Sequence, residues 1–191
     1  MPEPTYIGQC TPAAREMLLD FLDAARGDVA STVAKLDEAD LERSLLPTGW
    51  TPLQLLVHLA FMERRWIVWG FLGEAVNSPH GDRGDDVLGS FVTPQGWGVD
   101  EAIAVLEAQG RRTRDAVDGQ DLDTPAALGG RFTTEGEAPS LGWILLHVLG
   151  EYTRHQGQLD VAVELLEAAH ERYDEVPDAD YDEGRTGRAD T

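Results

Sequence analysis

Hydrophobic residues recur at intervals of three and four positions in four stretches of the chain, which is the spacing of one face of an α-helix. The first stretch opens with Thr11 and Pro12, a hydroxyl N-cap followed by proline at the first helical position, and should run to about Leu36. We expect its apolar stripe to face the interior of a helical domain. The stripe consists of Met17, Leu18, Phe21, Leu22, Ala25, Val29 and Val33.

The second stretch repeats this start signal as Thr51 and Pro52, and Gln54 is placed to complete a capping box. The pattern predicts a helix that ends near Gly73, after a linker at residues 37–49. Its inward positions are apolar except for one histidine. These positions are Leu55, His58, Leu59, Met62, Trp66 and Trp69.

The third stretch predicts a helix from about Val99 to Val117, and the fourth predicts a longer helix from about Ser140, a suitable N-cap, to Tyr173. In the third helix the expected inward residues are Ile103, Val105, Leu106 and Ala116, and the expected outward residues are Arg111, Arg112 and Arg114. Residues 77–98 are rich in glycine and aspartate and form a loop longer than most in compact domains. The whole pattern predicts an all-α fold.

The chain has 191 residues, which suits one domain with a hydrophobic core. We assign this domain to residues 1–173. Residues 174–191 are acidic and nearly free of large apolar side chains. Such a segment cannot bury enough apolar surface to offset its ordering entropy, so we expect a disordered tail.

Charge and cysteine content exclude several classes of function. The chain carries 35 acidic residues against 15 lysines and arginines, a formal net charge of −20, which disfavours binding to nucleic acid. The single cysteine, Cys10, excludes an internal disulfide and a CxxC metal site, so a thiol nucleophile would have to come from outside the protein. Neither a secretory signal nor a membrane span is apparent, and we expect a cytoplasmic protein.

Candidate metal ligands lie on the second and fourth predicted helices. His147, Glu151 and His155 form a row, because residues four apart share a helix face. Glu151 and His155 can bind one ion, and the third ligand must come from another element. His58 is the natural donor, since burying its imidazole unpaired in the bundle costs about 1–3 kcal/mol. A divalent cation removes that cost, so we predict a metal site made of His58, Glu151 and His155.

Two histidines and one carboxylate leave coordination positions open, as in catalytic zinc sites. Zinc is the first choice of metal, and nickel, iron(II) or manganese suit the same donors. His147 lies two helical turns, roughly 12 Å, from His155, so we expect it to support the ligands from outside or to pack in the core. The structural alternatives are that His58 is a hydrogen-bonded core residue and that Glu151 pairs with His155 on the surface.

Other residues near the candidate ligands have two interpretations each. Arg65 and Arg154 either contact an anionic substrate or form surface salt bridges. Trp66 and Trp69 either line a pocket or pack in the core. Two further histidines are expected to be exposed to solvent: His80 and His170.

Two segments in this order resemble the DinB-like superfamily of metal-binding four-helix bundles. They are GWTPLQLLVHLAFMERRW around His58 and SLGWILLHVLGEYTRHQGQLD around Glu151 and His155. The resemblance covers about residues 11–170 and is strongest to the branch that contains the N-terminal domain of mycothiol-dependent maleylpyruvate isomerase and its uncharacterised relatives. Carried over by position, the family's metal ligands fall on these same three residues, and the glutamate is the choice of the isomerase branch.

The resemblance implies a four-helix bundle with a long crossover between helices two and three, a metal bound at one end of the bundle, and frequent homodimers. It also suggests mycothiol as the external thiol. We expect no counterpart of the isomerase's additional C-terminal domain, because the tail after Asp174 is short and acidic.

The leading hypothesis is a divalent-metal-dependent enzyme that transfers or activates a low-molecular-weight thiol such as mycothiol. It would act on a small-molecule substrate, and the loop at 77–98 would partly cover the site. One alternative is a metal-assisted hydrolase of an amide or ester. The other is a metal-binding stress protein without catalytic activity.

Overall fold

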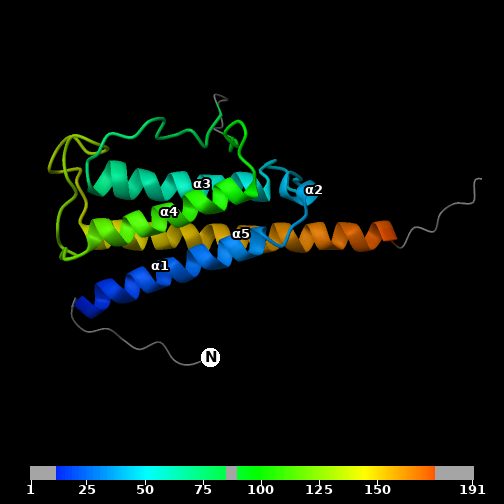
Figure 1. Ribbon diagram of the computed structural model, residues 1–191, viewed down its shortest axis with the longest axis horizontal. Coiled ribbons are helices and arrows are strands. Elements are labelled where there is room, and N and C mark those ends of the chain that lie inside the picture. Colours follow the sequence, from blue (N-terminus) through cyan, green and yellow to red (C-terminus); the bar gives the residue numbers. More distant parts are fainter. Residues whose placement is uncertain (1–11, 85–89, 175–191) are drawn as a thin grey trace, which may run out of the picture.

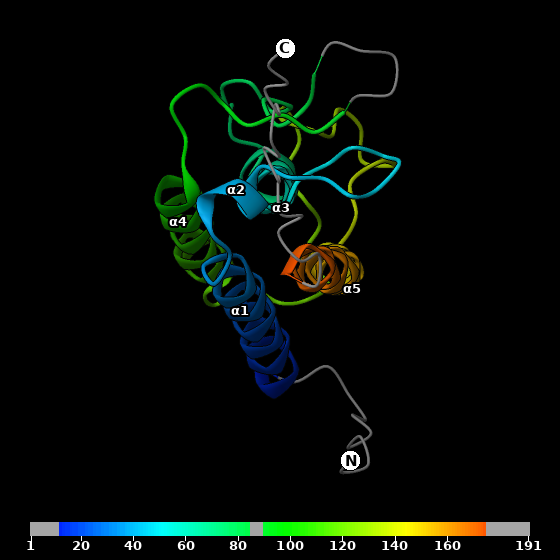
Figure 2. The ribbon, with the colours of Figure 1, turned by 90° about the vertical axis from the view of Figure 1, so that its right-hand side faces the viewer.

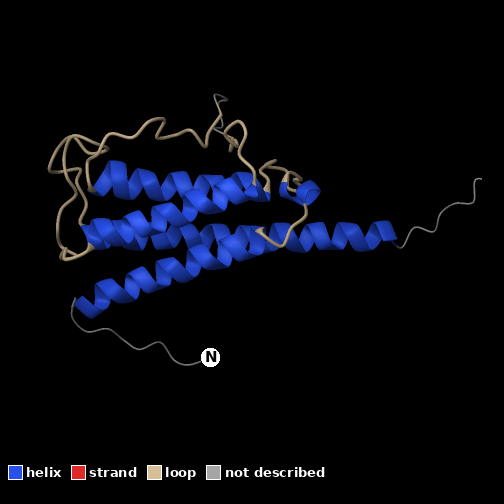
Figure 3. Ribbon diagram, in the orientation of Figure 1, coloured by secondary structure: helices blue, strands red, loops and turns tan. Residues whose placement is uncertain are grey.

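The computed structural model describes residues 12–84 and 90–174, and these form helices and no β-strand (Figure 3). The predicted all-α fold is therefore confirmed. The helices are α1 (Pro12–Val33), α2 (Glu38–Leu41), α3 (Pro52–Trp66), the π-helix η1 (Ile67–Phe71), α4 (Val99–Val117) and α5 (Leu141–Asp174). Cys10, the proposed N-cap Thr11 and residues 175–191 of the predicted tail lie outside the described residues, whereas Asp174 is the last residue of α5.

Four of these helices form a bundle (Figure 1). Seen end-on, α1 packs against α5 and α4, and α3 packs against the same two helices from the other side (Figure 2). Helices α1 and α5 run in one direction, and α3 and α4 run in the opposite one. The connection from η1 to α4 must therefore return along the length of the bundle, which is the long crossover expected between these two helices.

Local sequence signals explain where the helices begin. In α3 the capping box is complete, because the Gln54 amide N–H donates to Thr51 Oγ1 at 3.3 Å and the Thr51 N–H donates to Gln54 Oε1 at 3.1 Å. At the start of α5 the Trp143 N–H donates to Ser140 Oγ at 3.4 Å. The sequence pattern missed only the short α2, which Asp37 caps inside the predicted linker.

One expected core residue is in the wrong place. The side chain of Phe21 is 56% exposed, although the apolar pattern assigned it to the inward stripe of α1. The buried stripe of α1 is instead Leu19, Leu22, Arg26, Val29 and Val33. This stripe passes through an arginine, which a pattern based on apolar residues cannot include. The helix also ends at Val33 rather than at Leu36.

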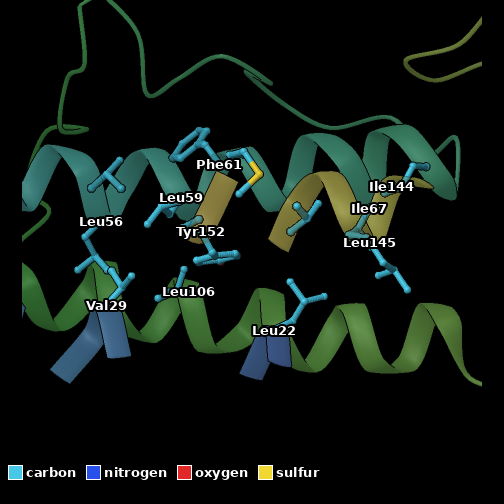
Figure 4. Close-up of a cluster of buried hydrophobic side chains, with 14 of the residues drawn as sticks. Leu22, Val29, Leu56, Leu59, Phe61, Ile67, Leu106, Ile144, Leu145 and Tyr152 are labelled. Carbon is cyan, nitrogen blue, oxygen red and sulfur yellow. The ribbon is translucent and has the colours of Figure 1, made fainter. Parts of the chain in front are cut away.

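The apolar core runs along the centre of the bundle (Figure 4). Side chains from α1, α3, α4 and α5 contribute to it, among them Leu22, Leu59, Leu106 and Ile144, all almost fully buried. Tyr152 of α5 lies among them with no exposed surface. Its hydroxyl group therefore needs a polar partner inside the core.

That partner belongs to a polar network centred on Glu63 of α3, which is completely buried. The Tyr152 hydroxyl donates to Glu63 Oε2 at 2.6 Å. Arg26 of α1 donates from Nε and Nη2 to the two carboxylate oxygens at 2.8 and 2.7 Å. The Thr113 hydroxyl of α4 donates to Glu63 Oε1. One carboxylate thus receives a hydrogen bond from each of the other three long helices.

The neighbours of Arg26 are adapted to this pairing. Gly110 of α4 leaves room for the guanidinium, because a Cβ at that position would lie 3.0–3.1 Å from atoms of Arg26. Asp23, one turn earlier on α1, accepts a further hydrogen bond from Arg26. Burial opposes the charge of Arg26, but the hydrogen bonds and the charge of Glu63 raise the pKa of the guanidinium above its ordinary value.

Replacing Arg26 with leucine would leave the Glu63 carboxylate buried without its cation. Removal of one partner from a buried ion pair costs about 3–5 kcal/mol, so we expect the free energy of unfolding to fall by that amount. Urea denaturation of Arg26→Leu measures the change. Arg111→Leu, on the exposed face of α4, is the matched control and should alter stability by less than about 0.5 kcal/mol.

The double variant Arg26→Leu/Glu63→Leu should be more stable than Arg26→Leu alone, since it buries no unpaired charge. Equal losses for Arg26→Leu and Arg111→Leu would show that the network does not hold the four helices together.

Candidate metal centre

His58 of α3 and the pair Glu151 and His155 of α5 converge between the two helices. Each offers one ligand atom, and these atoms all lie within 4.8 Å of one another. His58 and His155 are 3% and 8% exposed, and the Glu151 side chain is 18% exposed. The structure therefore brings the two predicted segments together at a partly enclosed point where one cation can contact all three side chains.

The two imidazole rings are held from behind. The Nδ1 atom of His58 lies 2.7 Å from Asp82 Oδ2, and the Nδ1 atom of His155 lies 2.8 Å from Gln158 Oε1. Each ring therefore keeps its Nε2 atom for another partner. A hydrogen bond to the far nitrogen fixes the ring orientation and tautomer, as in metal-ligating histidines generally.

Asp82 is one residue near the site that sequence reasoning missed. It lies in the crossover and is completely buried, with Arg65 as its ion-pair partner at 2.5 Å. Burial opposes its charge, but the hydrogen bonds from His58 and Arg65 lower the pKa of Asp82. One aspartate among 35 acidic residues carries no signal in the sequence that could have identified it.

The salt bridge to Asp82 also bears on Arg65, which the sequence assigned either to an anionic substrate or to a surface salt bridge. The guanidinium is buried, pairs with Asp82 and donates to the Pro79 carbonyl oxygen at 3.0 Å. Arg65 lines the cavity at the site, but its salt bridge is an internal one and not a surface pair. The salt bridge from Arg65 of α3 to Asp82 of the crossover holds Asp82 in place beside His58.

Burial keeps the candidate histidine ligands neutral. Desolvation lowers the pKa of His58, and desolvation followed by the charge of His58 lowers the pKa of His155. A neutral imidazole is the form that can donate an electron pair to a metal. The protonation state set by the fold therefore agrees with the metal-binding interpretation.

The carboxylate of Glu151 has only long contacts to its neighbours. Its oxygens lie 3.4 Å from His155 Nε2, 3.6 Å from His147 Nε2 and 3.6 Å from Arg154 Nη1. These distances exceed those of charge-assisted hydrogen bonds, so the lone pairs of the carboxylate remain available. Two imidazoles and one carboxylate are a donor set that fits zinc and other divalent transition metals.

His147 takes a different position from the three converging residues. Its ring packs with two indoles in a three-ring cluster, with centroids 4.2 Å from Trp66 and 5.1 Å from Trp143, and is parallel to the latter within 7°. Its Nε2 atom faces Glu151. This arrangement agrees with a supporting role beside Glu151.

The resemblance had implied a metal at one end of the bundle. The candidate site lies instead over the middle turns of the packed helices. His58 is six residues from the start of α3 and eight from its end. The crossover covers it, because Phe91 stacks on the His58 ring at a centroid distance of 4.2 Å. The described parts of the loop at residues 77–98 thus include a residue that covers the site, as we expected of this loop.

A cavity of about 420 Å³ opens beside the three candidate ligands. Met62, Trp66 and Phe91 form its apolar walls, and arginines and His80 add a polar lining. His80 is exposed as predicted, yet it contributes to this cavity. Arg154 also lines it, although its side chain is 67% exposed.

Two other predicted residues lie away from the cavity lining. Trp69 is half-buried, and its ring meets that of His80 edge-on at 6.1 Å. The His170 side chain is half exposed, and its Nε2 atom lies 3.2 Å from Asp40 Oδ1 near the far end of α5. Across the described helices, none is both long and apolar enough to cross a membrane.

A family model described as Mycothiol-S-transferase matches residues 17–168. A search of curated proteins gives no significant match. The matched range includes all of α3 and α4, most of α1 and α5, and all three candidate ligands. The predicted resemblance to the DinB-like superfamily is thereby confirmed, and the chain belongs to the mycothiol S-transferase family.

Proposed function

We propose that the protein is a divalent-metal-dependent S-transferase that joins a low-molecular-weight thiol, mycothiol in the first instance, to a small electrophile. The observation that carries the proposal is the convergence of His58, Glu151 and His155 beside a cavity of about 420 Å³. Family membership supports the thiol chemistry. Zinc as the metal, a cytoplasmic location, a homodimer and a single domain over residues 1–173 remain predictions.

In this proposal His58, Glu151 and His155 hold the metal, which when bound would favour the thiolate form of the substrate thiol at neutral pH. Asp82 and Gln158 keep the two imidazole rings turned toward the site. The apolar walls reduce access of water, so that the sulfur meets the electrophile rather than solvent.

At the electrophilic carbon one bond forms and one breaks, after the S–H bond of the thiol has been broken. The thiol loses its proton to solvent, its sulfur forms a bond to an electrophilic carbon, and the leaving group departs with the electron pair of the broken bond. The enzyme needs no cysteine of its own for this step. The residues of the cavity supply position and electrostatics, and the external thiol supplies the nucleophile.

The ligand assignment predicts a ranking of variants. The purified protein should contain about one zinc or other transition-metal ion per chain, measured by inductively coupled plasma mass spectrometry. His58→Ala, Glu151→Ala and His155→Ala should each lose the metal, because a site with two protein ligands binds weakly. His147→Ala is the matched control and should keep it. Loss of metal in His147→Ala with retention in His58→Ala would place the ion one turn earlier on α5.

Asp82 should tune metal affinity without binding the metal. Asp82→Asn weakens the hydrogen bond that orients His58, and such outer partners typically change affinity by about 10–100-fold. Competition with a chelator measures the dissociation constant for zinc. Asp115→Asn, on the exposed surface of α4, should leave it unchanged. Equal affinities in the two variants would contradict the role given to Asp82.

Thiol dependence separates the transferase from its alternatives. With a chlorinated aromatic electrophile, product should accumulate only when both mycothiol and metal are present, and mass spectrometry should detect the S-conjugate. Turnover of an ester or amide without any thiol would instead identify a hydrolase. A metal-loaded protein inactive in both assays would support the binding-protein alternative.

A further inference from the structure

The cavity at the candidate metal centre has a charge opposite in sign to that of the whole chain. Four arginines line it, namely Arg65, Arg83, Arg131 and Arg154, and in the described structure its one lining carboxylate is that of Glu151. The chain as a whole carries a formal net charge of −20. A cleft lined by charges of one sign concentrates their field, so this cavity attracts anions into an otherwise acidic protein.

Arg65 and Arg154 each have an acidic partner. Arg65 is paired with the buried carboxylate of Asp82, which commits it to holding the crossover. Arg154 is largely exposed and lies 3.6 Å from Glu151. These two guanidinium groups add positive charge to the cavity, but their acidic partners compete with any anion that would bind to them.

Arg131 has a different environment. Its guanidinium lies over the Trp66 indole, 4.0 Å from the ring centroid, and 5.9 Å from that of Trp69. Within the described part of the chain no carboxylate lies within ion-pairing distance of it. Burial, and then the charge of Arg65, lower the pKa of Arg131, so both effects disfavour its cationic form. A bound anion would relieve both.

The backbone around Arg131 fixes its position. The N–H groups of Arg131 and Ala127 donate to the carbonyl oxygens of Trp69 and Phe71, each at 2.9 Å. Both acceptors lie in the π-helix η1, and π-turns often accompany functional sites. Gly130 permits this close approach, because a Cβ there would lie 2.2 Å from the Trp69 oxygen. Backbone hydrogen bonds and close packing at Gly130 thus hold the main chain of Arg131 beside the cavity.

We propose that Arg131 binds an anionic group, a carboxylate, on the electrophile, so that the enzyme prefers electrophiles that are organic acids. The planar guanidinium matches a carboxylate in shape and offers two parallel N–H donors. Trp66 packs against the face of the guanidinium, a contact that uses none of its N–H donors, and Arg131 lines the cavity. The inference rests on the proposed transferase function, because it names the class of the second substrate.

A binding experiment with two probes of equal shape tests the inference. Zinc-loaded protein is titrated by calorimetry with benzoate and with benzamide. We expect benzoate to bind about tenfold tighter or more, the usual contribution of a hydrogen bond to a charged group. Arg131→Gln should lose most of this preference while its zinc content and helical circular dichroism stay unchanged. Arg111→Gln, exposed on α4, should retain the preference.

An unchanged preference in Arg131→Gln would mean that benzoate is held elsewhere, at the metal or by another arginine, and would overturn the proposal. If Arg131→Gln does not fold, Arg131→Lys decides the matter. It keeps the charge but lacks the planar pair of donors, so benzoate should bind several-fold more weakly and benzamide equally well. Identical benzoate binding in Arg131→Lys would also refute the role of Arg131.

Calorimetry needs no turnover, so the two proposals can fail separately. A preference for benzoate in a protein that forms no thiol conjugate would keep the anion site and refute the transferase. Thiol transfer to neutral electrophiles, with equal affinity for benzoate and benzamide, would keep the transferase and refute the anion site.

Discussion

The carboxylate of Glu63 is the constraint on which the arrangement of the helices depends. It has no exposed surface, and a buried charge is tolerated only when charge and hydrogen bonds compensate its loss of water. Arg26, Thr113 and Tyr152 provide that compensation from the three other long helices. Apolar side chains tolerate small shifts and repacking, whereas these directional contacts are satisfied in one relative position of the four helices.

The same constraint positions the candidate metal centre. Successive residues of an α-helix turn by about 100°, so fixing Tyr152 toward Glu63 also fixes the direction of its neighbour Glu151. On α3, Glu63 and His58 are five residues apart and therefore face different sides of the helix. The network occupies the centre of the bundle and the candidate ligands meet at the outer seam of α3 and α5. A single orientation of α3 and α5 about their axes therefore directs residues both to the Glu63 network and to the candidate metal centre.

Loops complete the cavity that the helices begin. The crossover brings Asp82 behind His58, and the loop between α4 and α5 brings Arg131 over Trp66. Neither residue belongs to the bundle, yet one orients an imidazole and the other adds positive charge to the cavity. Asp82 can be buried because it pairs with Arg65, and Arg131 can be partly buried because it lies on the aromatic face of Trp66.

The sequence by itself determined the helices, since capping residues and apolar spacing act locally: Thr51 with Gln54 starts α3, and the row from His147 to His155 shares one face of α5. It also indicated His58 as a companion of that row, because a polar side chain on an apolar stripe needs a partner. Only the tertiary structure decided that Arg26 replaces Phe21 on the inner stripe of α1 and that Asp82 and Arg131 join the site. These residues obtain their environment from segments distant in the chain, and burial of a charge depends on partners that local spacing does not contain.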